Sequence, residues 1–280
     1  MKTLQAQQVV EAVRQLPSLP AVVIELLQSA DKDDVNADEL ANKIALDQAL
    51  AAKALKVANS PFYGLQSKVA SIQDATVILG LRQIRSLVAA AAVTGAFAQS
   101  RHSWFDQRLF WQHCVGVALC ARTLAAEAGV SEDGAFTAGL LHDIGRLVLV
   151  TCFPDEYREA LAYQKKHDCF LLTAERDVLG LDHAQVGQAL AERWHFAPSI
   201  QAAVAHHHAP EEATADSLAG VVHVADVMAH ALDLCPREDE LVPPLSAVAW
   251  NRLGIDWGRF KQMLATVEDR FEDVCTALNI

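Results

Sequence analysis

Histidine and aspartate, two side chains that bind transition metals, are concentrated in one part of this chain. A histidine is followed directly by an aspartate at His142-Asp143, inside the apolar run "AGLLHDIGRLVL" of residues 138–149. Burying an ionised carboxylate beside an imidazole is costly unless a metal or a partner charge compensates. None of the eleven histidines precedes residue 102, and ten lie between residues 113 and 230. The pair therefore predicts either a metal site or the remnant of one.

Helical periodicity lets the direction of each candidate side chain be tested. His113 shares an apolar stripe with Val117, Cys120 and Leu124, at offsets of four, seven and eleven residues. A single inward histidine is most often a core residue with a satisfied hydrogen bond. Several inward His and Asp residues on five helices instead favour a metal site, because facing helices can bring such ligands to one point. The inward set comprises His113, His142, Asp143, His183, His207, His208 and Asp226.

The other titratable residues of this region keep two interpretations open. His102, His167 and His195 have positions typical of a surface or a helix end, whereas His206, His223 and His230 either support the ligands or face solvent. Glu175, upstream of His183, either orients a ligand imidazole from behind or faces solvent, as most helix carboxylates do.

The elements that must position these residues are predicted to be helices throughout. Asn36 with Glu39 resembles a capping box, Asp47 can cap the following helix, and Pro61 ends that helix. No convincing period-two strand occurs, so the fold class is all-α. Further helices are expected near residues 72–79, 81–98, 106–128, 132–150, 155–167, 170–178, 182–195, 198–208, 216–233 and 258–277.

Composition limits the classes of protein that fit. The chain has 280 residues, 52% hydrophobic and 21% charged, which suits a large buried core. The net charge of −12 argues against a nucleic-acid partner, because phosphate-backbone binding relies on clustered Lys and Arg. No membrane span and no signal peptide are expected, which predicts a cytoplasmic protein. The six cysteines form no C-x-x-C pair, which indicates reduced core thiols.

A polar stretch at residues 98–104, "AQSRHSW", interrupts the helical pattern and marks the expected division of the chain. Residues 1–100 are predicted to form an N-terminal helical lobe. Residues 101–280 are predicted to form a second lobe that carries every histidine. Short loops commonly join the helices of one bundle, so the two lobes need not be separate domains.

Several ordered motifs resemble those of a known protein family. The series His113, His142-Asp143, His183, His207-His208 and Asp226 is similar to that of the HD superfamily of metal-dependent phosphohydrolases. The wider sequence resembles the HDOD (HD-related output domain) family of bacterial signalling proteins over roughly residues 10 to 235. The matching segments include "LPSLPAVVIELLQSADKDDVNADELANKIALDQALAAKALKVANSPFYG", "SIQDATVILGLRQIRSLV", "FWQHCVGVALCARTLA", "AGLLHDIGRLVL", "AERDVLGLDHAQVGQALAERW" and "HHHAP".

The resemblance implies a two-metal site of divalent Fe, Mn, Ni or Zn. It implies that one ion is held by His113, His142, Asp143 and Asp226. Asp143 would bridge to a second ion held by His183, His207 and His208. Within the run of three histidines, the family's HH-x-P spacing selects the last two, because Pro210 then falls in place.

Two departures from the related HD-GYP enzymes limit what the resemblance implies. No G-Y-P follows the histidine run, and position 109 is leucine where some of those enzymes carry a glutamate that supports a third ion. A site of three metals is therefore not expected. Arg146, one turn after His142, stands where those enzymes carry a phosphate-contacting lysine, and it either clamps a phosphate or is a capping or surface arginine.

Two functions of different classes follow. The first is a metal-dependent phosphohydrolase acting on a nucleotide or another phosphoester, in which Asp143 and Arg146 take part in the chemistry. The second is a noncatalytic signalling output or scaffold module that binds protein partners. In that alternative, Asn59, Ser60 and Tyr63 of "ALKVANSPFYG" present a partner surface, although a capped helix end followed by an ordinary turn is the more common arrangement.

Overall fold

The computed structural model describes residues 3–30, 36–60, 63–65, 68–97, 102–214, 218–235 and 241–278. These residues form helices and connecting segments with no β-strand, which confirms the predicted all-α class. The first part of the chain contains α1 (Ala6–Gln15), α2 (Ala21–Gln28), α3 (Ala37–Leu46), α4 (Gln48–Ala58), α5 (Ile72–Leu79) and α6 (Leu81–Ala96).

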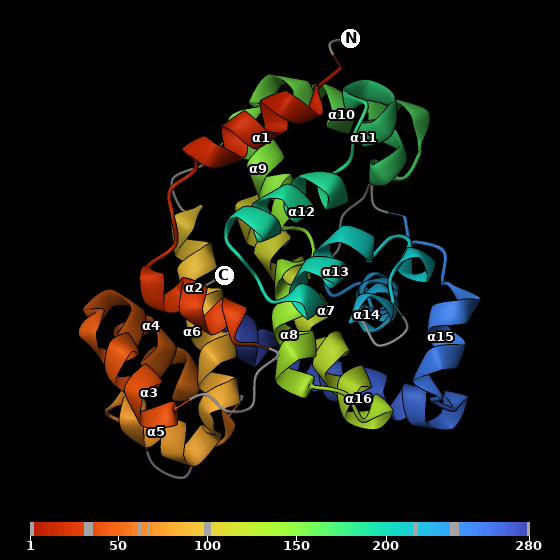
Figure 1. The fold of residues 1–280 in the computed structure, drawn as a ribbon. Coiled ribbons are helices and arrows are strands. Elements are labelled where there is room, and N and C mark those ends of the chain that lie inside the picture. Colours follow the sequence, from red (N-terminus) through yellow and green to blue (C-terminus); the bar gives the residue numbers. More distant parts are fainter. Residues whose placement is uncertain are drawn as a thin grey trace.

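The second part contains the helices that carry the candidate site (Figure 1). Most of them begin and end within two or three residues of the predicted ranges. They are α7 (Gln107–Ala128), α8 (Glu132–Leu141), α9 (Ile144–Cys152), α10 (Pro154–His167), α11 (Leu171–Leu179), α12 (His183–Arg193), α13 (Pro198–His206), the short 3-10 helix η2 (Pro210–Glu212), α14 (Ala219–Ala231), α15 (Ala247–Leu253) and α16 (Trp257–Leu278).

The predicted helix starts at α3 and α4 are present. The Asn36 side chain accepts hydrogen bonds from the backbone N–H groups of Asp38 and Glu39, and Asp47 accepts one from Leu50 N–H. Each bond satisfies a donor that the first turn of a helix leaves without an intrahelical partner. The predicted stop at Pro61 lies outside the described residues.

The single helix predicted over residues 132–150 is wrong, because the chain breaks at the His142-Asp143 pair. Helix α8 ends at Leu141 and α9 starts at Ile144, with Asp143 at φ −94° and ψ 11° between them. Neighbouring residues of a continuous helix point about 100° apart, so a regular helix could not aim both side chains at one point. The break turns His142 and Asp143 toward the same cluster.

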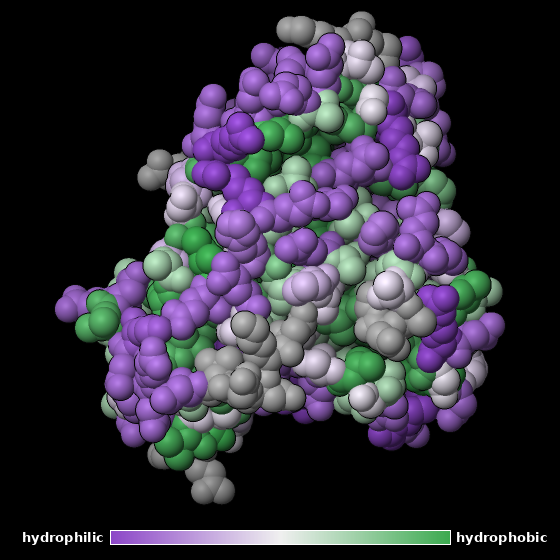
Figure 2. All heavy atoms as spheres, viewed as in Figure 1, coloured by the Kyte–Doolittle hydropathy of each residue, from purple (hydrophilic) through white to green (hydrophobic). Residues whose placement is uncertain are grey.

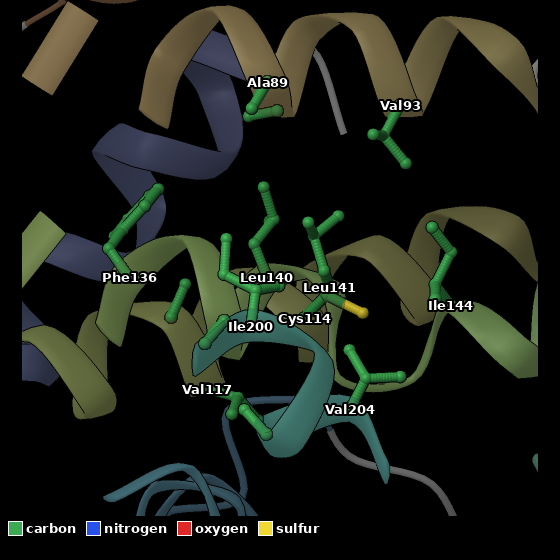
Figure 3. Packing of buried hydrophobic residues seen from close by; sticks show 14 of the residues in the cluster. Ala89, Val93, Cys114, Val117, Phe136, Leu140, Leu141, Ile144, Ile200 and Val204 are labelled. Atoms are coloured by element: carbon green, nitrogen blue, oxygen red, sulfur yellow. The ribbon is translucent and has the colours of Figure 1, made fainter. Parts of the chain in front are cut away.

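Helix α7 lies at the centre of the second part, in contact with α8, α14 and α16. Gly139 of α8 permits this close approach, because a Cβ atom there would lie 2.9 Å from the Cα of Ala118. Figure 3 shows apolar side chains of α6, α7, α8, α9 and α13 meeting in this core. Ordered packing on this scale fixes the directions of the polar side chains that the same helices carry.

The two parts of the chain are in direct contact. Helix α1 packs on α12, and Leu4 N–H donates to Leu179 O at 2.7 Å. Ala197 N–H donates to Leu27 O at 2.9 Å, and α6 packs on α8. The division near residue 100 stays a prediction, since residues 98–101 are outside the described ranges.

Two segments, Gln107–Ala128 and Glu132–Cys152, are long and apolar enough to cross a membrane by length and composition alone. Within them, 72% and 89% of the most apolar window is buried inside the protein. Their apolar surface is therefore already covered by other helices. Figure 2 shows a face that is largely hydrophilic, with smaller hydrophobic areas between the polar residues.

Candidate metal centre

The structure brings all seven predicted site residues to one place. His113 comes from α7, His142 and Asp143 from the junction of α8 and α9, His183 from the start of α12 and Asp226 from α14. His207 and His208 follow the last residue of α13 directly. His208 is half-buried and the others are buried, so the cluster is an internal feature of the fold.

One group of ligand atoms surrounds His183. Its Nε2 atom lies 2.9 Å from His208 Nε2, 3.3 Å from His207 Nε2 and 3.1 Å from Asp143 Oδ1. Ligands about 2.1 Å from one ion, at angles of about 90–110°, lie about 3.0–3.4 Å from each other. The spacing of this group therefore fits donors that share one metal ion.

A second group surrounds Asp226. Its Oδ1 atom lies 3.3 Å from His113 Nε2, 3.4 Å from His230 Nε2 and 3.9 Å from His142 Nε2. His142 Nε2 in turn lies 3.7 Å from Asp143 Oδ1. Asp143 Oδ1 thus faces both groups.

The ring nitrogens that face away from the cluster show which atoms are available as ligands. His142 Nδ1 donates to Gly139 O at 2.6 Å, and His207 Nδ1 donates to Val204 O at 3.0 Å. A carbonyl oxygen only accepts, so each Nδ1 carries the proton and a neutral ring keeps its lone pair on Nε2. Both lone pairs point into the cluster, which is the arrangement of metal-binding histidines.

Unsatisfied buried atoms test whether a cation fits here. His142 Nε2 and Asp226 Oδ1 are buried and complete no hydrogen bond with any described residue. Leaving such polar atoms unpaired costs about 1–3 kcal/mol each. Both atoms belong to the group around Asp226, and both can donate an electron pair. A divalent cation between them satisfies both, so the residues present fit a metal.

The ionisation states divide the histidines into two kinds. Burial, together with the nearby His142 and His183, lowers the pKa of His207 to about 3. Burial opposes a charge on His183 as well, but the carboxylates of Glu175 and Asp143 raise its pKa to about 10. His207 is therefore neutral at pH 7, whereas His183 holds a proton that a metal ion must displace.

The two aspartates stay ionised although they are buried. Burial opposes the charge on Asp143, but His142 and Arg146 hold the pKa of its carboxyl well below the usual range. Burial likewise opposes the charge on Asp226, and contacts with His113 and His230 hold its pKa well below the usual range. Both carboxylates are thus available as anionic ligands at neutral pH.

Arg146 is bound to the cluster. Its Nη1 atom donates to Asp143 Oδ2 at 2.8 Å, and its Nε atom donates to the Tyr157 hydroxyl at 3.1 Å. The guanidinium carbon lies 5.7 Å from the ring centre of Phe110. Arg146 is 5% exposed, so the surface interpretation is wrong. Since Oδ2 of Asp143 is engaged by Arg146, Oδ1 is the oxygen that faces the two imidazole groups.

Local packing explains how α12 brings His183 to the pair at 142 and 143. Asp182 caps α12 by accepting from Gln185 N–H, which places His183 at the first helical position. A Cβ atom on Gly145 would clash with His183 O, and one on Gly187 would face Val204 at 2.7 Å. Glycine at position 145 therefore permits the contact between α9 and α12 that joins Asp143 to His183.

Three residues of the centre are not in the predicted set. Glu175 is fully buried and bonded to His183 through Nδ1 at 2.6 Å and through the backbone N–H at 2.9 Å, so it orients this ring and does not face solvent. His230 lies four residues after Asp226 on α14, a spacing that places both on one helix face and could have indicated it. His223 is buried, and its Nδ1 donates to His207 O at 2.7 Å.

The other predicted residues lie elsewhere. His206 is partly exposed, with Nδ1 3.8 Å from Glu212 Oε2. Asn59 bonds to both backbone groups of Val69, and Ser60 is buried. Asn59 therefore joins the end of α4 to Val69, and the partner surface of Asn59, Ser60 and Tyr63 stays a prediction.

The centre opens into a cavity of about 190 Å³. Its inner end is formed by the His and Asp cluster and Arg146, and its remaining walls come from the start of α11 and the segment before α15. A small molecule can thus approach the ligand atoms directly.

Comparison with known proteins identifies the family of this chain. A model of the HDOD domain matches residues 16–210, more than half of the chain. The chain belongs to the HDOD domain family. Over 213 residues, this HDOD protein is 26% identical to an uncharacterized protein of Treponema pallidum (strain Nichols), covering 74% of this chain and 41% of that protein. Over 127 residues it is 32% identical to Ribonuclease Y of Thermus thermophilus, covering 45% of this chain and 17% of that enzyme.

Solved structures share the whole fold. An HDOD domain protein of unknown function from Geobacter sulfurreducens matches with a TM-score of 0.81 at 24% identity, covering 98% of each chain. A candidate phosphohydrolase from Shewanella amazonensis SB2B matches with a TM-score of 0.77 at 29% identity, covering 97% of this HDOD chain and 98% of that one. The HDOD protein spans less than half the length of the two sequence relatives above, but nearly all of these two structures.

Proposed function

We propose that this HDOD protein is a divalent-metal-dependent phosphohydrolase that acts on a nucleotide or another phosphoester in the bacterial cytoplasm. The observation that carries the proposal is the pair of ligand groups that meet at Asp143 Oδ1. Divalent ions bound by these groups would supply a Lewis acid that lowers the pKa of water and offsets charge on phosphoryl oxygens. Sequence similarity to a candidate phosphohydrolase of known structure supports the same reaction class.

Each residue of the centre has a role in this proposal. His113, His142, Asp226 and His230 would hold one ion, and His183, His207 and His208 would hold the other. The Oδ1 atom of Asp143 faces both ligand groups. Glu175 fixes the ring of His183, which must lose its proton when the metal binds. Mn, Fe, Ni and Zn all accept this mixture of imidazole and carboxylate ligands.

Arg146 serves the reaction from the edge of the metal centre. Its guanidinium lines the cavity and is fixed by Asp143, Tyr157 and the face of Phe110. A positioned guanidinium matches the geometry of phosphate oxygens. In hydrolysis, the oxygen of water bonds to phosphorus, the ester P–O bond breaks, and a proton passes to the leaving alcohol oxygen. Arg146 offsets negative charge on the phosphoryl group during this exchange.

The test is hydrolysis of a phosphoester panel by the full chain after reconstitution with Mn²⁺ or Fe²⁺. Asp143→Asn keeps the size of the side chain but removes the charge between the two groups, and we expect turnover to fall by about a thousandfold or more. Asp155→Asn is the matched control, because Asp155 is an exposed carboxylate on α10. Turnover that is equal in the wild-type protein and Asp143→Asn would contradict the proposal.

A signalling module that binds protein partners is the second candidate. One observation favours it: Leu46 on α3 and Val77 on α5 are each 85% exposed, and these two helices pack against each other. Large exposed apolar side chains are a common feature of protein interfaces. A pull-down with wild-type protein and with Val77→Asp tests this candidate. It predicts a partner that the variant loses.

A further inference from the structure

The cavity over the metal centre changes character from its inner end to its mouth. All of its described titratable lining residues belong to the metal centre or contact it: the His and Asp ligands, His223 and Arg146. The walls beyond them are apolar, apart from the neutral Gln164 and Thr173. The apolar lining residues are Phe170, Leu171, Leu172, Leu241, Pro243 and Pro244.

Among the described lining residues, charge is therefore confined to the metal centre and Arg146. Arg146 is the one lysine or arginine among the described lining residues, and it lies beside Asp143. A phosphoryl group at the inner end has the metal ions and this guanidinium to offset its charge. A second anionic group, farther along the ligand, would lie against Phe170 and Leu241, where the described lining residues offer no cation to offset it. Removing an ion from water without such compensation is costly.

The apolar walls are anchored parts of the fold. Phe170 is the residue before the first turn of α11, and its side chain is 39% exposed. The segment with Leu241 and the two prolines is tied down at its end, since Ser246 N–H donates to His223 Nε2 at 2.9 Å. His223 in turn donates to His207 O, so this wall is linked to the metal ligands. An exposed aromatic ring on an anchored wall gains contact area when an apolar group covers it.

The size of the cavity limits the ligand as well. Its volume of about 190 Å³ is below the roughly 300–1,000 Å³ of typical small-molecule sites. Such a space encloses a phosphoryl group and one compact organic group. It does not enclose two nucleotides.

We infer that the centre selects compact phosphomonoesters whose organic part is uncharged and aromatic or apolar. The phosphoryl group lies at the inner end beside Arg146, and the organic group lies against Phe170 and Leu241. This inference rests on the proposed phosphohydrolase function and specifies its substrate class.

Three phosphonates that cannot be hydrolysed test the inference by binding alone. Their affinities for the metal-reconstituted full chain are measured by isothermal titration calorimetry. Phenylphosphonate should bind about tenfold more tightly than methylphosphonate, because the ring buries apolar area against the wall. It should also bind at least about tenfold more tightly than 4-phosphonobenzoate, whose carboxylate meets the apolar wall.

Substitutions in the cavity wall test which residues cause the difference in affinity. Phe170→Ala should remove most of the preference for phenylphosphonate over methylphosphonate. Val77→Ala is the control, since Val77 is an exposed apolar residue on α5, outside the cavity lining. Leu241→Arg should reverse the penalty on 4-phosphonobenzoate by supplying a cation at the mouth.

The outcomes separate this inference from the function on which it rests. Binding of all three phosphonates with equal affinity, or a preference that Phe170→Ala leaves intact, would overturn the substrate class alone. Failure of all three to bind the metal-loaded protein would overturn the phosphate site, and with it both proposals. The stated order of affinities, lost in Phe170→Ala, is the result that supports the inference.

Discussion

Helices α1 to α6 and helices α7 to α14 both bury apolar cores, but they differ in how many ionisable side chains they bury. In the described part of α1 to α6, Arg85 is the one buried ionisable side chain. In α7 to α14 and their connections, the buried polar set includes His113, His142, Asp143, Arg146, Glu175, Asp182, His183, His207, His223 and Asp226. The described core of the first region is thus almost wholly apolar. The buried charges of the second therefore call for another explanation, and a metal centre supplies one.

Gly145→Ala should have the largest effect, because it acts on the contact between α9 and α12 that builds the metal centre of the second region. The new Cβ atom would meet His183 O, so α9 and α12 must move apart and Asp143 must lose contact with His183. We expect a loss of stability on the order of 3 kcal/mol, with loss of the ion at His183. Thermal unfolding and metal content measure the two effects.

Gly220→Ala is the matched control for that variant, since its Cβ atom would lie 3.8 Å from Ala249, an ordinary contact. Alanine is a better helix former than glycine, so this control should be neutral or slightly stabilising. Equal effects of the two substitutions would mean that the approach of α9 to α12 does not build the centre.

Glu175→Gln should weaken metal binding by about 10–100-fold, the usual effect of losing a group that orients a ligand. Glutamine keeps the size of Glu175, but it removes the charge that faces His183 Nδ1 at 2.6 Å. A Mn²⁺ titration measures the change. Glu159→Gln, an exposed position on α10, is the control and should bind as the wild-type protein does. An unchanged affinity in Glu175→Gln would separate Glu175 from the metal centre.

Metal binding at His183 should release a proton at pH 7. Its pKa is raised to about 10, so below pH 10 an incoming ion must displace the proton. Affinity at this group should rise by about tenfold per pH unit up to about pH 10 and then level off. His207, with a pKa of about 3, is already neutral and releases none.

Calorimetry in buffers of different ionisation enthalpy measures this proton. Glu175→Gln should reduce the release, because Glu175 is the first carboxylate that raises the pKa of His183. Heats that do not depend on the buffer would show that His183 does not bind the metal.

His230→Ala should have a smaller effect. It should lower the binding affinity of one of the two ions by about tenfold, or roughly 1.4 kcal/mol. The ring is one of several ligands around Asp226, and the others remain. His206→Ala is the control, since His206 is partly exposed beside Glu212. Two ions bound as tightly in His230→Ala as in the control would remove His230 from the ligand set.

Arg85→Met should leave metal binding unchanged, because Arg85 belongs to the first region and not to the metal centre. Arg85 donates to Ser29 O in the first region, and its loss should cost about 1–3 kcal/mol of stability. Chemical denaturation measures the cost, and elemental analysis measures the metal. A loss of metal in this variant would mean that metal binding also depends on the packing of the first region.

The sequence predicts helices and inward faces well, because both follow from local periodicity. The range 72–79 matches α5 at both ends. Helices α1, α2 and α15 are not among the predicted ranges. The break between α8 and α9 serves the cluster, and local helix propensity gives no sign of it.

The centre could be predicted from helical periodicity as a set of inward residues, whereas its division into two ligand groups was an expectation that only the family resemblance supplied. Which imidazoles surround His183 and which surround Asp226 depends on how five helices pack, and no local pattern encodes that. Glu175 looks like an ordinary helix carboxylate until α11 and the start of α12 are placed together. His230 could have been predicted from its four-residue spacing from Asp226 on α14. The hydrogen bond from Arg146 to Asp143 could not, because it depends on the turn between α8 and α9.

The most direct test of the metal centre is elemental analysis of the untagged full chain beside Asp143→Ala, each reconstituted with Mn²⁺ and Fe²⁺ and then freed of loose ions. We expect about two tightly bound ions per chain in the wild-type protein and loss of both in the variant, because Asp143 Oδ1 faces both ligand groups. No metal in either protein would contradict the account, and His142-Asp143 would then be the remnant of a site.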